Sequence, residues 1–227
     1  MRPFFIHIPK NGGMTIRRSP LVNVQVATEN THASPAYTAA LKKKMKQTND
    51  HPGIEHCPLR FINASLWFNH RPFAIVRNPW DRVVSRYFFA KKVIEVEKKV
   101  PASYADVSSF ENFLEERHKW GSEDFMWHRA VRGWYPALFH VSDKNTGRIA
   151  HNVDILRFEN YNEDFRNYFK IKSDPQPRNV TALNKRPYRD IYTPETIQIV
   201  ADWYKDDIDT WGYDFDTGPT RNTWALK

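Results

Sequence analysis

The sequence has a single cysteine, Cys57, in 227 residues. One cysteine excludes an internal disulfide bond and a cysteine-rich zinc site. The sequence also lacks any apolar run near the roughly 20 residues that a membrane-spanning helix needs. Lys10 interrupts the apolar start, which is too short for a signal peptide. These absences lead us to expect a cytoplasmic protein, unless an N-terminal anchor has been removed.

Acidic residues are fewer than basic ones: 26 Asp and Glu stand against 34 Lys and Arg, which gives a formal net charge of +8. This excess favours polyanionic or phosphorylated partners, and it leaves nucleic acid, a nucleotide, an acidic glycan and a membrane surface open. The hydrophobic fraction of 41% is enough for a core. The length, without repeats or low-complexity tracts, indicates a single domain over residues 1–227.

Segments of strand character alternate along the chain with segments of helical periodicity. The expected strands are 4–8, 21–26, 73–76 and 153–158, the last at the end of a hairpin over 137–158 that turns at 143–147. The expected helices are 13–18, 36–47, 79–98, 108–117, 123–132, 162–170 and 194–210. This alternation predicts an α/β fold, a P-loop-like three-layer domain with a central, mostly parallel sheet flanked by helices.

The first motif is FFIHIPKNGGMTI, residues 4–16. An expected strand runs here into a turn with Gly12 and Gly13 and then into a helix start. Backbone N–H groups at such a start bind anions, and glycine allows the close approach of a ligand. Lys10 adds a positive charge and Thr15 a hydroxyl donor. The motif therefore predicts a phosphate or sulfate site, with a plain strand-to-helix turn as the alternative.

The same stretch is not a Walker A sequence, which reads Gly-x-x-x-x-Gly-Lys-Ser/Thr. Here Lys10 precedes the glycines, and no Lys-Ser/Thr pair follows them. The usual magnesium ligand is thus missing from the motif, so ordinary ATP hydrolysis is disfavoured.

The second motif is FAIVRNPWDRVVSRYFF, residues 73–89. Arg77 lies between the expected strand and the expected helix. In open α/β sheets, ligands collect at the carboxyl ends of strands, so Arg77 would share an edge with the first motif. Ser85 lies about two turns into the helix. The alternative is structural, with Arg77 paired to Asp81 or Asp106 and Ser85 as a small packing residue.

Together the two motifs resemble the carbohydrate sulfotransferases, Golgi-type and bacterial enzymes that use 3′-phosphoadenosine 5′-phosphosulfate (PAPS). The segment HIPKNGGMTI is similar to their 5′-phosphosulfate loop, His-Ile-Pro-Lys-Thr-Gly-Gly-Thr-Ser. FAIVRNPWDRVVSRYFF is similar to their 3′-phosphate motif, Arg-x-Pro-x-x-Arg followed by Ser. DILRFENYNEDF and TPETIQIVADWYKDDIDTWGYDF also resemble segments of smaller members. The resemblance covers most of the chain in the same order.

The resemblance implies that Lys10 contacts the 5′-phosphosulfate near its bridging oxygen and stabilises the leaving group. It implies that backbone and hydroxyl donors come from Asn11, Gly12, Gly13, Met14 and Thr15. Arg77 and Ser85 would hold the 3′-phosphate. Lys185 and Arg186 would close over the 3′-phosphate or the adenine, or else be merely exposed. Asn11 stands where the family commonly has Thr, and Met14 where it commonly has a small hydroxyl residue; both leave the backbone donors intact.

The reaction also needs a base for the acceptor hydroxyl, and a neutral imidazole suits that role near pH 7. We predict that His32 is this base. Its context, His-Ala-Ser-Pro, resembles the segment where related sulfotransferases place a histidine base, and its loop is expected on the active-site side. The alternatives are Glu29, His7 and His128. The histidines without a comparable context include His51, His56 and His70.

The leading hypothesis is in-line transfer of a sulfuryl group from PAPS to a hydroxyl acceptor, with a carbohydrate as the preferred acceptor and 3′,5′-ADP as the product. It requires no metal, and nucleic acid is not the expected partner. One alternative is a nucleotide or small-molecule kinase with an atypical phosphate loop. The other is a non-catalytic basic module that binds polyanions. The lack of a visible anchor favours a bacterial or viral host cell over the Golgi, while the sequence leaves acceptor, oligomeric state and source open.

Overall fold

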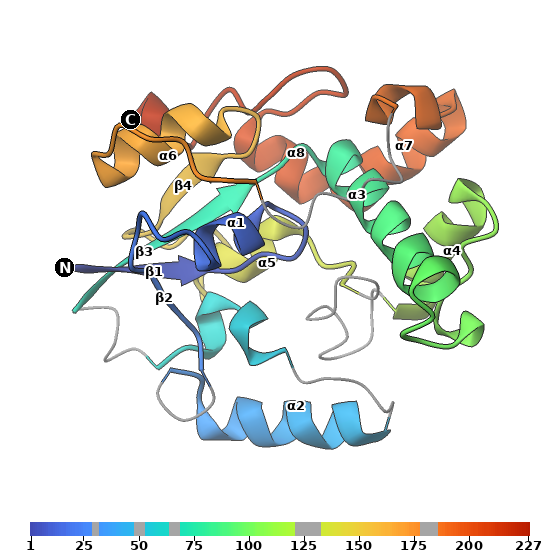
Figure 1. The fold of residues 1–227 in the computed structure, drawn as a ribbon, viewed down its shortest axis with the longest axis horizontal. Helices are drawn as coiled ribbons and strands as arrows, with labels where there is room; N and C mark the ends of the chain where they lie inside the picture. Colours follow the sequence, from blue (N-terminus) through green and yellow to red (C-terminus); the bar gives the residue numbers. More distant parts are fainter. Residues whose placement is uncertain (29–31, 48–52, 64–68, 121–132, 178–185) are drawn as a thin grey trace.

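The computed structural model describes residues 1–28, 32–47, 53–63, 69–120, 133–177 and 186–227. In this part of the chain, four strands form one sheet in the order β2-β1-β3-β4, and all neighbouring strands are parallel (Figure 1). The strands are β1 (Arg2–Ile6), β2 (Gln25–Val26), β3 (His70–Val76) and β4 (Asp154–Arg157). The predicted α/β fold with a parallel sheet is confirmed, although the strand expected over 21–26 keeps only two residues.

Eight α-helices are formed by the described residues. They are α1 (Gly13–Arg17), α2 (Pro35–Gln47), α3 (Pro79–Lys91), α4 (Phe110–Trp120), α5 (Ala137–Val141), α6 (Tyr161–Phe169), α7 (Pro194–Trp203) and α8 (Lys205–Trp211). Helix α3 continues as a π-helical turn over Lys92–Val96. Within the described ranges, none of these helices combines the length and apolar character that crossing a membrane requires.

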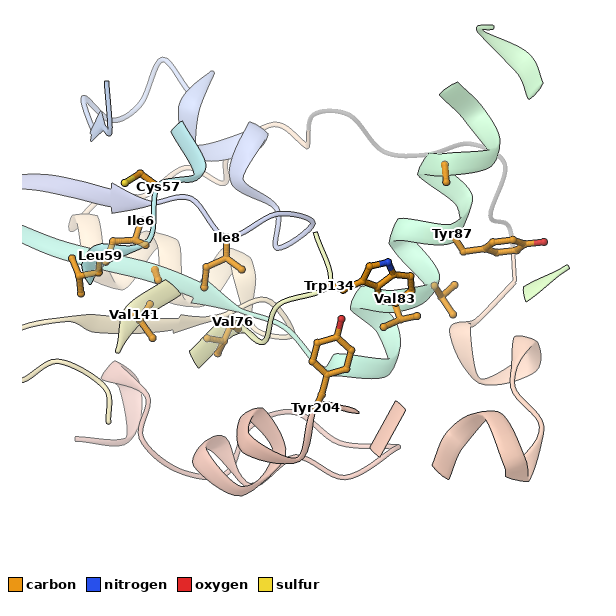
Figure 2. Packing of buried hydrophobic residues seen from close by; sticks show 14 of the residues in the cluster. Ile6, Ile8, Cys57, Leu59, Val76, Val83, Tyr87, Trp134, Val141 and Tyr204 are labelled. Carbon is orange, nitrogen blue, oxygen red and sulfur yellow. The ribbon is translucent and has the colours of Figure 1, made fainter. Parts of the chain in front are cut away.

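Each face of the sheet has its own hydrophobic core, because successive strand residues point to opposite faces. One face packs Phe5 and Phe73 against Ile16 of α1 and Phe165 of α6. The other face joins a larger cluster with side chains from α2, α3, α4, α5, α7 and α8. Figure 2 shows part of that cluster around the labelled side chains Ile6, Val76, Val83, Trp134 and Tyr204. Helices on both faces of the sheet give the expected three layers.

Helix α3 begins as the residue pair Asn78-Pro79 favours. The Asn78 side chain accepts hydrogen bonds from the N–H groups of Trp80 (3.0 Å) and Asp81 (3.5 Å). Its amide nitrogen also donates to the carbonyl of Asp214 (2.9 Å), so the cap connects the helix to the C-terminal segment. Arg77, just before this cap, is thereby held at the carboxyl end of β3.

Two further predicted elements differ from the structure. Residues Ala137–Val141 form helix α5 and not a hairpin strand, because the Asp207 carboxylate accepts from the N–H groups of Ala137 (2.7 Å) and Leu138 (2.8 Å) and caps the helix. The turn that follows is confirmed, since Ser142 and Ile149 form an antiparallel bridge. The helix expected over 194–210 is divided at Tyr204 into α7 and α8. The helix predicted for 123–132 lies outside the described residues.

Candidate functional site

A cavity of about 520 Å³ lies at the carboxyl ends of β1 and β3. It is bounded by the loop from β1 to α1, by α3 and by the start of α6. The lining residues are His7, Pro9, Lys10, Gly12, Gly13, Met14, Thr15, Arg17, Glu55, His56, Arg77, Ser85, Phe88, Phe89, Phe158, Tyr161, Asn162, Pro175 and Pro177. The structure therefore brings both sequence motifs to one cavity at the sheet edge where ligands of α/β proteins collect.

The loop between β1 and α1 is fixed to the sheet by a buried side chain. The amide of Asn11, 1% exposed, donates a hydrogen bond of 2.8 Å to the carbonyl of Ile75 in β3. Lys10 (φ 68°) and Gly12 (φ 78°) adopt the left-handed conformation that makes the turn. The N–H of Thr15 donates to the carbonyl of Gly12 (3.1 Å), whereas the N–H groups of Gly13 and Met14 come too early in α1 for an intrahelical acceptor. Asn11 thus has a structural role for its side chain, and the backbone of the loop lies at the cavity.

Glycine is required at position 13 because the ring of His7 lies close to its Cα atom, and not because of its backbone dihedral angles. A Cβ atom at this position would lie 2.1 Å from Cδ2 and Nε2 of His7. At Gly12, a Cβ atom would lie 2.9 Å from Cε2 of Tyr161. Any side chain larger than glycine would therefore displace the loop or its neighbours.

Tyr161 is a loop contact that the sequence did not reveal. Its hydroxyl donates to the carbonyl of Gly12 (3.2 Å) and shares a side-chain hydrogen bond with Thr15. The two partners are almost 150 positions away along the chain, so no local pattern marks this residue. Tyr161 ties the start of α6 to the loop and holds the Thr15 hydroxyl at the cavity wall.

Lys10 is half-buried, and its ammonium lies over the ring of Phe89, 4.3 Å from the ring centroid. Burial lowers the pKa of Lys10 to about 7, and repulsion from Arg77, Arg86 and Lys92 adds to this shift. The ammonium is thus held in a region of positive potential, where an anionic ligand would be favoured. Near neutral pH both protonation states of Lys10 are populated.

Arg77 is oriented by three hydrogen bonds. Its Nε and Nη2 donate to the two carboxylate oxygens of Asp81, each at 2.7 Å, and its Nη1 donates to the carbonyl of Lys10 at 2.9 Å. The guanidinium also lies over the ring of Phe158, 4.0 Å from the centroid. Because a guanidinium has five N–H groups, two of them stay available for a ligand. Ser85, two turns along α3, lines the same cavity.

Two further arginines of α3 are buried behind the loop. Arg82, 1% exposed, donates from Nε to the carbonyl of Pro9 (3.2 Å) and from Nη1 to that of Tyr135 (3.1 Å). Arg86, fully buried, stacks on the ring of Trp134 at 4.4 Å. Arg82 therefore supports the loop from beneath, whereas neither arginine lines the cavity.

His56 lines the cavity, although its sequence context gave no indication of a role. Its Nδ1 lies 2.8 Å from the carbonyl oxygen of His7. A carbonyl oxygen only accepts, so this Nδ1 carries the proton, and in the neutral ring the lone pair is on Nε2. The ring of His7 lies 4.2 Å from that of His56, and burial lowers the pKa of His7 well below its usual value. The neutral form of His7 is therefore favoured beside the ring of His56.

His32 was expected on the active-site side, and the structure places it elsewhere. It does not line the cavity, and its ring lies 5.2 Å from that of Phe4, with His70 also close by. Its Nδ1 accepts from the N–H of Thr28 at 3.2 Å, since a backbone N–H only donates. The proton of the neutral ring is therefore on Nε2, which leaves no lone pair for abstracting a proton.

Of the remaining predicted residues, Arg186 alone lies in the part of the chain that the structure describes. Arg186 is exposed and is not part of the lining. Lys185, Glu29 and His128 lie outside the described residues. Among the described residues, no group of three or more His, Cys, Asp or Glu side chains is placed to hold a metal ion.

Comparison with known proteins identifies the family. A sequence model described as the sulfotransferase family matches residues 4–214, a range that contains both motifs. The chain therefore belongs to the sulfotransferase family, and it is a transferase that moves sulfuryl groups. A crystal structure of a sulfotransferase from Alicyclobacillus acidocaldarius is similar over 95% of this chain and 98% of that chain, with 16% sequence identity and a TM-score of 0.46. The comparison with curated proteins found no match.

Proposed function

We propose that this sulfotransferase moves the sulfuryl group of PAPS to a hydroxyl of a carbohydrate. The observation that carries the proposal is that Lys10 and the glycine loop share one cavity with Arg77 and Ser85. Two anion-binding groups on one cavity match the two anionic ends of PAPS, the 5′-phosphosulfate and the 3′-phosphate. The volume of about 520 Å³ lies within the range of roughly 300–1,000 Å³ that small-molecule sites have.

The loop is proposed to bind the 5′-phosphosulfate. Backbone N–H groups of Gly12, Gly13 and Met14 and the Thr15 hydroxyl would donate to its oxygens. Arg77 and Ser85 would donate to the 3′-phosphate, for which the planar fork of arginine is well suited. The ring of Phe158 beside Arg77 offers an apolar wall for the nucleoside. The contribution of Lys185 and Arg186 to this end stays a prediction from the sequence.

His56 is proposed as the base in place of the predicted His32. The Nδ1–H of His56 is held by the His7 carbonyl, and its Nε2 lone pair would accept the proton of the acceptor hydroxyl. The acceptor oxygen would then form a bond to sulfur while the bond from sulfur to the bridging oxygen breaks, which releases 3′,5′-ADP. Lys10, in its ammonium form, would stabilise the charge on that bridging oxygen. His7 is the nearest alternative, since it lines the same end of the cavity.

A carbohydrate is the proposed acceptor because of the net positive charge of the chain, which favours acidic glycans. Arg17 and Glu55 form an ion pair of 3.3 Å on the wall next to His56. These two charged side chains offer a donor and an acceptor to sugar hydroxyls that approach the base.

The test is sulfuryl transfer from PAPS to a panel of glycans that carry or lack carboxylates, followed by mass spectrometry of the products. We expect a mass gain of one sulfuryl group and matching release of 3′,5′-ADP. Lys10→Met should lose this activity, whereas Lys46→Met, on the exposed face of α2, should keep it. Phosphoryl transfer from ATP-magnesium in place of sulfuryl transfer would replace the proposal with a kinase. Salt-sensitive glycan binding without turnover would indicate a binding module.

A further inference from the structure

We propose that Phe89 is a positioning residue for Lys10: its ring holds the ammonium at the cavity wall and favours the charged form that the reaction uses. This inference rests on the proposed function only for its effect on turnover. The contact itself belongs to the protein without any substrate.

The geometry is that of a cation–π contact. Lys10 Nζ lies 4.3 Å from the centroid of the Phe89 ring, well inside the distance of about 6 Å at which such contacts act. Phe89 lies four residues after Ser85 on α3, so both face the cavity from one side of the helix. The ring is half-buried and packs against the large core, which fixes its position.

The charges around Lys10 are repulsive for its ammonium, so the Phe89 ring matters for holding that charge. The groups that face it and act on its charge are Arg77, Arg86 and Lys92, all positive. Asp81 is engaged by Arg77 and Glu97 by Lys92, so neither carboxylate forms an ion pair with Lys10. Within the described part of the chain, Lys10 Nζ has no hydrogen bond or ion pair. The face of the Phe89 ring is thus the attractive contact that the described residues make with the Lys10 ammonium.

Loss of the ring would remove the favourable interaction while the repulsion and burial persist. We expect the Lys10 pKa to fall by about one unit in Phe89→Leu, since a desolvated cation–π contact is large enough for that shift. A fall from about 7 to about 6 reduces the charged fraction roughly fivefold at pH 7 but only about twofold at pH 6. A purely structural defect would lower turnover by the same factor at both pH values.

The direct experiment is an NMR titration of the protein carrying [13Cε]lysine, without substrate, in which Lys10 is identified by the signal missing in Lys10→Met. Phe89→Leu should lower the Lys10 pKa, whereas Phe89→Tyr, which keeps the ring, should not. Phe88→Leu is the matched control, because Phe88 also lines the cavity from α3. An unchanged Lys10 pKa in Phe89→Leu, or an equal fall in Phe88→Leu, would overturn the inference.

Turnover distinguishes this inference from the proposed function. A shifted Lys10 pKa together with no sulfuryl transfer by the unmodified protein would refute the proposed function and leave the role of Phe89 intact. Normal sulfuryl transfer with an unchanged Lys10 pKa in Phe89→Leu would refute the role of Phe89 and leave the proposed function intact. Should Phe89→Leu fail to fold, as judged by its melting temperature, Phe89→Met supplies a longer and more flexible apolar side chain without a ring, and the same two outcomes apply.

Discussion

The carboxylate of Asp81 accepts two parallel hydrogen bonds of 2.7 Å from the guanidinium of Arg77. The pair joins residues four apart at the start of α3, and the third hydrogen bond of Arg77 reaches the carbonyl of Lys10. One carboxylate therefore sets the direction of the arginine that joins the two motifs. The structural alternative from the sequence, an ion pair with Asp81, and the proposed ligand role are compatible, because two N–H groups of Arg77 stay available.

Asp81→Asn should weaken the binding of 3′,5′-ADP by about tenfold, because an amide cannot accept both hydrogen bonds that orient the guanidinium. Binding of 5′-AMP, which has no 3′-phosphate, should change little. Calorimetric titration measures both affinities, with Asp209→Asn on the exposed surface of α8 as the control. Tighter binding of 3′,5′-ADP in Asp81→Asn would mean that the carboxylate only repels the ligand and does not position Arg77.

His56→Ala should lower turnover by about 10²- to 10⁴-fold, the usual contribution of general base catalysis. The affinity for 3′,5′-ADP should stay the same, since the base acts on the acceptor. His32→Ala should keep most of its turnover once any loss of folded protein is corrected for, because its Nδ1 bonds to the backbone of Thr28. A large fall in His32→Ala with normal activity in His56→Ala would restore the prediction from the sequence.

Gly13→Ala should destabilise the protein by about 1–3 kcal/mol, the usual cost of overpacking, because the new Cβ would lie 2.1 Å from the His7 ring. Thermal unfolding would detect this as a lower melting temperature. The double variant His7→Ala, Gly13→Ala should be more stable than the sum of the two single changes implies, since the smaller side chain makes room for the methyl group. Strict additivity would show that the two positions do not touch.

Lys10→Met should raise the melting temperature at pH 6 while it abolishes turnover. The pKa of Lys10 is lowered from 10.5 to about 7, so its charge is unfavourable in the folded state. This destabilisation is fully present below about pH 7, declines as pH rises above 7 and disappears near 10.5. The difference in melting temperature between Lys10→Met and the unmodified protein should therefore narrow from pH 6 to pH 9. A difference that widens with pH would contradict the sign of this linkage.

The two motifs could be predicted from the sequence because each depends on local signals. The glycine pair after an apolar strand and the Asn78-Pro79 start of α3 need only neighbouring residues to be interpreted. Parallel pairing of β1 with β3 then brings Lys10 and Arg77 together, as expected for strand ends in one sheet. The single domain over 1–227 and the roles of the site residues stay predictions.

The proposed base, His56, and the loop contact, Tyr161, could not be found in that way. His56 reaches the cavity through a hydrogen bond to His7, 49 positions earlier, and Tyr161 reaches Gly12 across 149 positions. Such contacts are set by the path of the chain and not by local pattern. His32 shows the converse case, since its local context suggested the active-site side but the path of the chain places it beside Phe4. The same applies to α5, whose cap Asp207 is 70 positions from Ala137.

The most direct test of the account is calorimetric titration with 3′,5′-ADP, with 5′-AMP and ATP-magnesium as comparison ligands. We predict micromolar binding of 3′,5′-ADP that depends on its 3′-phosphate and is lost in Arg77→Ala, while Arg166→Ala, a half-buried arginine of α6 that does not line the cavity, retains it. Equal affinity for 5′-AMP, preference for ATP-magnesium, or full binding by Arg77→Ala would contradict the proposed donor site.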